Sequence, residues 1–170
     1  MRTCIAVLAI LSHTTPAQAE GCFGAGTELF HCTVEAGRKT ADVCLQGDVA
    51  VYRFGPTGGE ADLLLARGVD EVDMTPWPGV GRTIWEDMTF HNGDHGYTIS
   101  RAMDRMIAED DPDQSMDMRG TVVVTKRNET LSELECDPGS VSFGDFYPLF
   151  EAKEAAGQCW DREAFAWAKC

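Results

Sequence analysis

The stretch RTIWEDMTFHNGDHGYTISR, residues 82–101, decides the fold class of this chain. It holds two runs rich in aromatic, threonine and isoleucine side chains, with Asn92-Gly93 between them. Two β-prone runs around an Asn-Gly pair are typical of a β-hairpin with a tight turn. Because side chains alternate between the two faces of a strand, Met88 and Phe90 of the first run lie on one face. The stretch therefore predicts an antiparallel hairpin with one apolar side.

The same stretch holds two histidines, His91 and His95, with Asp94 beside the second. Imidazole and carboxylate groups this close in sequence are candidates for a metal site. A two-residue turn, centred on Asn92-Gly93 or one position later, keeps the apolar residues of both runs on one face and sends the two imidazoles to opposite faces. We therefore expect a structural hairpin without a bound metal, and the alternative is a metal site formed by His91, Asp94 and His95.

Short β-prone runs of this kind continue on both sides of the hairpin, separated by segments rich in Gly, Pro, Asn and Asp. They predict an all-β fold, an eight-stranded antiparallel meander that closes into a small barrel. We expect the barrel over residues 28–136, within a single domain that covers residues 20–170. The eight expected strands are Glu28–Val34, Thr40–Leu45, Val49–Phe54, Ala61–Ala66, Arg82–His91, His95–Arg101, Gly120–Lys126 and Thr130–Glu135.

The last part of the chain, residues 145–170, has a different composition and predicts a short helical tail linked by a disulfide. Pro148 suits the first turn of a helix, which we expect from Leu149 to Ala156 with Gly157 ending it. Asp161 is a suitable cap for a second helix, Arg162–Lys169. Four aromatic side chains are expected to pack this tail against the barrel, namely Phe150, Trp160, Phe165 and Trp167.

Residues 1–19 have the features of a secretory signal peptide. Arg2 gives a positive start, Cys4–Leu11 is a short apolar run, and Ala17-Gln18-Ala19 is a small-x-small cleavage site. We expect cleavage before Glu20 and export to the periplasm or the medium. Membrane insertion is not expected, because no apolar run in the sequence has the length of a transmembrane helix.

Six cysteines follow the expected cleavage point, and no two of them form a C-x-x-C pair. An even number of cysteines in an exported chain favours disulfides over zinc, with fifteen pairings open. One of these pairings joins cysteines that are close in sequence and flank a short segment, namely Cys32 with Cys44 and Cys159 with Cys170. That choice leaves Cys22–Cys136 as the third disulfide.

The formal net charge of −14 disfavours nucleic acid and anionic membranes as partners, because phosphate binding needs clustered Lys and Arg. A cationic partner is what this charge attracts at long range, although solubility alone also explains an acidic surface. The acidic segment Asp104–Asp117 is a calcium candidate. It lacks the glycine and the terminal glutamate of an EF-hand loop, which favours a solvated loop.

No catalytic motif is present, since the chain has no G-x-S-x-G elbow, P-loop or G-x-G-x-x-G sequence. We therefore expect a non-enzymatic protein without a cofactor. Glu86 is the one unusual carboxylate, because it falls on the apolar face of its strand. An ion pair with Arg53 or Arg101 explains it as a structural residue, whereas a cleft with a raised carboxyl pKa would make the chain a hydrolase.

The run FHCTVEAGRKTADVCLQGDVAVYRFG, residues 30–55, has the layout F-x-C, then a second cysteine, then Y-R-F-G. With the segments that follow, it resembles, over residues 30–136, a set of small exported proteobacterial proteins that have no assigned activity. More loosely, the layout is similar to the periplasmic lysozyme inhibitors of the membrane-bound or c-type class. The resemblance implies an eight-stranded barrel and an inhibitory loop that inserts a serine and a basic residue into the lysozyme cleft.

The stretch nearest to that inhibitory loop is PGVGRTIW, residues 78–85. Gly81 corresponds to the glycine of the motif and Arg82 to the nearby basic residue, while the two serines and the tyrosine are absent. With Trp77 beside them, these residues form the expected partner-binding site. Together with the acidic charge, the resemblance implies an exported binding protein that inhibits a cationic partner such as a basic lysozyme-like hydrolase. The alternatives are a small metal-binding protein and an uncharacterised hydrolase.

Overall fold

The computed structural model describes residues 22, 26–104, 118–141 and 143–170. The expected signal peptide and all but the first residue of the acidic segment Asp104–Asp117 lie outside these residues. In the part of the chain that is described, no helix has the length and apolar content needed to cross a membrane.

Antiparallel β-strands form most of the described chain, which confirms the all-β prediction. One five-stranded sheet has the order β10-β1-β2-β3-β4, a second has the order β5-β6-β7-β8-β9, and β11 and β12 form a hairpin. In chain order the elements are β1 Thr27–Val34, β2 Lys39–Gln46, β3 Val49–Pro56, β4 Leu63–Gly68, the 3-10 helix η2 Val69–Glu71, β5 Asp73–Thr75, β6 Thr83–Asn92, β7 His95–Asp104, β8 Met118–Lys126, β9 Glu129–Glu135, β10 Phe143–Gly144, α1 Tyr147–Ala155, β11 Gln158–Asp161 and β12 Ala166–Lys169.

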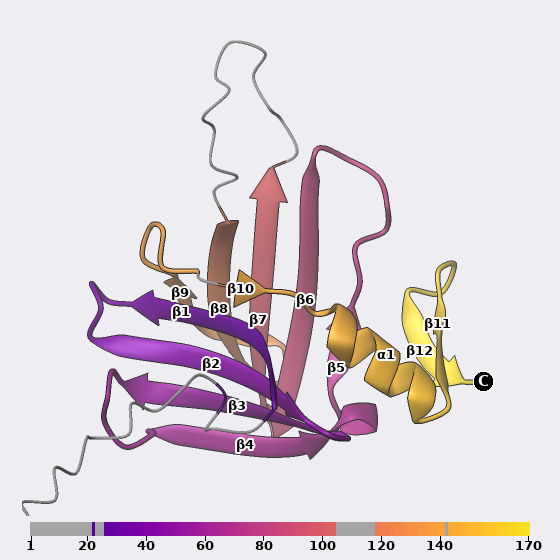
Figure 1. The fold of residues 1–170 in the computed structure, drawn as a ribbon, viewed down its shortest axis with the longest axis horizontal. Helices are drawn as coiled ribbons and strands as arrows, with labels where there is room; N and C mark the ends of the chain where they lie inside the picture. Colours follow the sequence, from indigo (N-terminus) through magenta and orange to yellow (C-terminus); the bar gives the residue numbers. More distant parts are fainter. Residues whose placement is uncertain (1–21, 23–25, 105–117, 142) are drawn as a thin grey trace, which may run out of the picture.

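The two five-stranded sheets stack face to face, with their strands running across one another (Figure 1). None of the sheets closes on itself, so the expected single barrel of eight strands is not the arrangement found. The 3-10 turn η2 redirects the chain after β4, and the three-residue β5 then pairs with β6 and not with β4. The first sheet instead gains β10, which returns from the tail to pair with β1.

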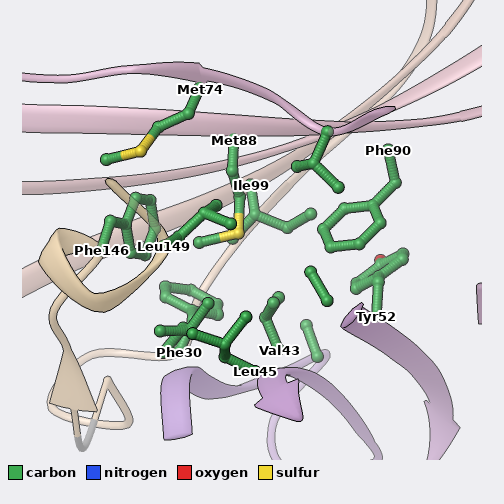
Figure 2. Close-up of a cluster of buried hydrophobic side chains, with 14 of the residues drawn as sticks. Phe30, Val43, Leu45, Tyr52, Met74, Met88, Phe90, Ile99, Phe146 and Leu149 are labelled. Carbon is green, nitrogen blue, oxygen red and sulfur yellow. The ribbon is translucent and has the colours of Figure 1, made fainter. Parts of the chain in front are cut away.

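Apolar side chains from the facing sides of both sheets fill the space between them (Figure 2). Tyr52 of β3 stacks on Phe90 of β6 with ring centroids 5.6 Å apart, which joins the two layers. Phe146 and Leu149 from the tail complete the cluster and are fully buried. Burial of this apolar surface is the main force that holds the sheets together.

The central hairpin has the register of the later of the two expected turns. Phe90 pairs with Tyr97 and Met88 with Ile99, so the two turn residues are Gly93 and Asp94. The expected apolar face is confirmed, since Met88, Phe90 and Ile99 are all fully buried.

The disulfides are Cys22–Cys44, Cys32–Cys136 and Cys159–Cys170. Only the last matches the expected pairing, and both Cys32–Cys44 and Cys22–Cys136 are wrong. Cys32 pairs with Ala41 across the ladder between β1 and β2, so Cys44, three residues further along β2, points to the opposite face. Three disulfides indicate an oxidising compartment.

The tail contains one helix and one hairpin, not two helices. Helix α1 begins two residues before the expected start, but the expected second helix Arg162–Lys169 is wrong, because this segment turns back as β12. Asp161 Oδ1 accepts hydrogen bonds from the backbone N–H groups of Glu163 and Ala164. The expected cap of a helix thus stabilises a hairpin turn instead. The Cys159–Cys170 bond closes the open end of the same hairpin.

Candidate functional site: the β5–β6 loop and the adjacent aromatic groove

The segment between β5 and β6, residues 76–82, forms a long loop that runs beside β6 from the short β5 to the start of β6 (Figure 1). The Trp77 indole Nε1 donates a hydrogen bond of 3.1 Å to the Val80 carbonyl, which ties the base of the loop to its tip. Gly79 and Gly81 have φ angles of 85° and 96°, in the left-handed region that favours glycine. The sequence of the loop therefore favours this conformation, through the Trp77 hydrogen bond and the two glycines.

The tip of this loop, residues 79–82, presents an apolar and a cationic side chain to solvent. Val80 is 71% exposed, the highest value among the exposed large apolar residues of the described chain. Arg82 is exposed as well, and no hydrogen bond or salt bridge joins it to any residue that the structure describes. A guanidinium in this position keeps its full capacity to bind a carboxylate of another molecule.

The base of the same loop forms one wall of a groove of about 410 Å³. The other walls come from α1 and from the β11–β12 hairpin, which lie side by side (Figure 1). The lining consists of aromatic and proline rings, two charged side chains and one disulfide-bonded cysteine: Pro76, Trp77, Pro78, Phe150, Glu154, Cys159, Trp160, Arg162 and Phe165. We call this feature the aromatic groove.

The hairpin wall of the aromatic groove is fixed from behind by Trp167. Its indole Nε1 donates a hydrogen bond of 2.7 Å to the Met74 carbonyl in β5, and its ring contacts Phe150 and Trp160 at centroid distances of 5.0 and 5.5 Å. Phe165 packs edge-on against Trp160 at 6.2 Å and remains 57% exposed. The groove is thus a preformed surface with solvent-exposed aromatic rings.

Two opposite charges line the aromatic groove without neutralising each other. Glu154 in α1 and Arg162 in the hairpin turn are both exposed, and neither side chain bonds to any residue within the described ranges. The Trp160 indole N–H likewise has no hydrogen-bond partner there, and its side chain is half-buried. These groups can bind a ligand that carries polar or charged atoms beside an apolar body.

The expected partner-binding residues divide between the two features. Trp77 lines the aromatic groove, whereas Gly81 and Arg82 lie at the loop tip. Phe150, Trp160 and Phe165 are expected from the sequence only to pack the tail, so their place in the groove is not predicted. The signal for it was the pair of cysteines that brackets two tryptophans, CWDREAFAWAKC, residues 159–170.

The two histidines of the central hairpin do not meet. His91 pairs with Gly96 and His95 with Asn92 in the ladder, so the side chains lie on opposite faces of the sheet. His91 Nε2 contacts an Asp73 carboxylate oxygen at 2.7 Å, and His95 Nδ1 contacts Asp94 at 2.9 Å. Across residues 22, 26–104, 118–141 and 143–170, no three metal-ligating side chains converge. The structure therefore places Asp94 beside His95 but does not bring His91 to them.

The Glu86 carboxylate, the hydrolase candidate, is held in an ion pair with Arg101, one of its two expected partners. Arg101 Nε donates to Glu86 Oε2 at 2.9 Å, and the Arg101 guanidinium lies 5.6 Å from the centre of the Phe146 ring. Glu86 is only 13% exposed and does not line the aromatic groove. Its position is explained by structure, since a half-buried charge requires a partner of this kind.

Arg53, the other expected partner of Glu86, instead belongs to a charged row across the outer side of the first sheet. Asp42 accepts a hydrogen bond of 3.2 Å from Arg53 Nη1 and contacts His31 Nδ1 at 2.5 Å. The hydrogen bond with Asp42 raises the pKa of His31 above its ordinary value of 6.5. The three residues are direct cross-strand neighbours, which is the arrangement of a structural ladder.

No protein-family model, curated protein or solved structure matches this chain.

Proposed function

We propose that this protein is an exported, non-enzymatic binding protein that inhibits a basic lysozyme-like hydrolase through the tip of its β5–β6 loop. The observation that carries the proposal is the exposed Arg82 guanidinium, which has no bond to the described chain and lies two residues from the exposed Val80. We further propose that the protein acts in the periplasm or outside the cell, an assignment supported by its three disulfides.

The chemistry of a glycosidase cleft favours this loop as an inhibitor. Such a cleft holds two carboxyl groups beside the bond to be cleaved. An arginine that enters the cleft donates paired hydrogen bonds to a carboxylate, which planar guanidinium geometry makes stronger than a lysine contact. The bond from Trp77 to Val80 holds the loop in shape before binding, so that less conformational entropy is lost on association.

The charge of the chain favours a basic target. A net charge of −14 attracts a cationic hydrolase over distances of about 10 Å at moderate ionic strength, and this attraction raises the rate of encounter. The specific contact is then made by a residue of the opposite sign, Arg82, which binds to the acidic cleft of an otherwise basic partner.

The test is a titration of several basic lysozymes with the purified protein, with cell-wall hydrolysis and complex formation as readouts. We expect at least one enzyme to be inhibited, and Arg82→Ala to weaken that inhibition by roughly thirtyfold, the effect of an interface hot spot. Arg127→Ala is the matched control, because Arg127 is 80% exposed in the β8–β9 turn, away from this loop. Absence of inhibition by the unmodified protein, or equal inhibition by Arg82→Ala, contradicts the proposal.

A further inference from the structure

We propose that the aromatic groove is a second binding site, which takes an extended, proline-containing peptide segment of a partner protein with a basic side chain beside its prolines. The site is separate from the loop tip and does not depend on the hydrolase proposal. Three properties of the groove favour such a ligand: its fixed walls, its aromatic rings and its two unpaired charges.

The walls are built before any ligand arrives. The Cys159–Cys170 disulfide closes the hairpin at one end, and the Asp161 carboxylate closes its turn at the other. Trp167 attaches the hairpin to β5 through its 2.7 Å bond to Met74. A ligand that docks here therefore does not have to order the surface, which lowers the cost of binding.

The rings favour an extended peptide. Phe165 has a φ angle of 52°, a conformation that is strained for a bulky residue, and this backbone holds the ring edge-on to Trp160 while more than half of it stays exposed. Aromatic-lined grooves bind polyproline II segments, whose rings and stems lie flat on the aromatic faces. Such segments make no internal hydrogen bonds, so their carbonyls are free to accept from the unpartnered Trp160 indole N–H.

The charges set the chemistry of the segment. Glu154 gives the groove a carboxylate that no described residue neutralises, and the whole chain is strongly acidic. A lysine or arginine of the ligand pairs with Glu154 and places its stem over the neighbouring rings, where a cation is also attracted by the ring faces. Arg162, on the hairpin side, binds a carboxylate of the same segment. Charge complementarity therefore favours a peptide with a basic side chain and a nearby carboxylate.

The test uses the full chain and short synthetic peptides, with tryptophan fluorescence and calorimetry as readouts. One peptide carries Pro-Pro-x repeats with a lysine and a free carboxyl end, and a second has glycine in place of every proline. We expect saturable binding of the first peptide and at least about tenfold weaker binding of the second, because the flexible chain loses more entropy on docking. Chitin oligosaccharides are a third probe, since sugars also stack on aromatic rings.

Matched variants locate the site. Phe165→Ser should weaken peptide binding by about tenfold or more, whereas Leu131→Ser, at a residue of the same 57% exposure on β9, should leave it unchanged. Glu154→Gln should weaken binding of the lysine peptide several-fold. Glu151→Gln, in the same helix but outside the groove lining, should leave this binding unchanged. Phe165 and Glu154 are both exposed, so their variants should keep the fold.

Several outcomes overturn the inference. They are no binding of either peptide, equal binding of the proline and glycine peptides, unchanged binding by Phe165→Ser, and saturable binding of the oligosaccharides without binding of the peptide. Failure of this inference is distinguishable from failure of the hydrolase proposal, because the Phe165→Ser variant should inhibit a sensitive lysozyme as the unmodified protein does. In the same way, Arg82→Ala should bind the proline peptide with unchanged affinity.

Discussion

Lys153 Nζ donates a hydrogen bond of 2.6 Å to the main-chain carbonyl of Val72, in the interior of the protein. The same ammonium donates to the Val69 carbonyl at 2.8 Å and lies 4.9 Å from the centre of the Trp167 ring. The Lys153 residue is 1% exposed. One side chain thus joins α1, the segment from η2 to β5, and the hairpin that forms the aromatic groove.

Replacement of this ammonium by an apolar group should destabilise the fold. Lys153→Met keeps most of the stem but leaves the Val69 and Val72 carbonyls without their donor, and we expect the free energy of unfolding to fall by about 1–3 kcal/mol. Urea unfolding followed by tryptophan fluorescence measures the change. Lys126→Met, at a 44% exposed position, should change stability by no more than about 0.5 kcal/mol. Equal midpoints for the two variants would show that the buried bonds have no net effect.

Acid should weaken the contact between Asp137 and the β1–β2 turn. Asp137 accepts hydrogen bonds from the backbone N–H groups of Ala36 and Gly37 and from the Thr33 hydroxyl. The Thr33 bond and these backbone bonds hold the pKa of Asp137 below its ordinary value of 3.8. Because the folded-state pKa is the lower one, the stabilisation is present above pH 3.8 and is lost as the pH falls through the folded-state value.

The variant Asp137→Asn tests this pH dependence. We expect it to be less stable than the unmodified protein at neutral pH, with a difference that narrows below pH 3.8 as the native carboxylate becomes protonated. Thermal unfolding between neutral pH and pH 2 is the measurement. Asp48→Asn, at an exposed residue of the β2–β3 turn, should leave the acid branch of the curve unchanged. A stability difference that stays constant with pH would contradict the role of the carboxylate.

The alternation of side chains predicts the central hairpin because it is a local property. Burial on one face fixes the parity of Met88, Phe90 and Ile99, and the parity survives either placement of the turn. The same argument, applied to β1 and β2, excludes Cys32–Cys44, since the two side chains have opposite parity. Strand register is therefore a better guide to the pairing of these cysteines than their distance in the sequence.

The division into two sheets and the aromatic groove depend on contacts that no local pattern records. Arg162–Lys169 is rich in good helix formers, yet the Cys159–Cys170 bond and the Trp160–Trp167 cross-strand pair impose a hairpin. The groove needs the loop around Trp77 to meet this hairpin, which lies far from it in the sequence. Composition indicated the aromatic residues, and the tertiary structure gave them their place.

Gly120 should be intolerant of any side chain, for a reason of space. A Cβ atom at this position would lie 2.6 Å from Cys136 Sγ and 2.8 Å from Phe30 Cζ. Gly120→Ala must therefore displace the disulfide or the core ring, and we expect a loss of about 1–3 kcal/mol in unfolding free energy. Thr121→Ala, at the next and half-buried position of β8, should cost less in the same urea titration. If the two variants unfold together, the core around Phe30 is looser than these distances imply.

Removal of Cys32–Cys136 and removal of Cys159–Cys170 should affect stability and peptide binding differently, because the two disulfides differ in span. Cys32–Cys136 closes 104 residues of sequence and joins the two sheets, whereas Cys159–Cys170 closes 11. From chain entropy alone, loss of the longer bond should cost about 2 kcal/mol more than loss of the shorter one. We therefore expect the double alanine variant of Cys32 and Cys136 to have the lower unfolding midpoint.

The variant without Cys159–Cys170 should show the opposite balance. Its unfolding midpoint should fall less, while its affinity for the proline peptide should fall more, because the released hairpin no longer holds Trp160 and Phe165 in position. Measuring both quantities on both variants removes the ambiguity of a variant that simply unfolds. A hairpin variant that keeps full peptide affinity would mean that Trp167 and its bond to Met74 are enough to hold the groove, and the disulfide would then have no part in binding.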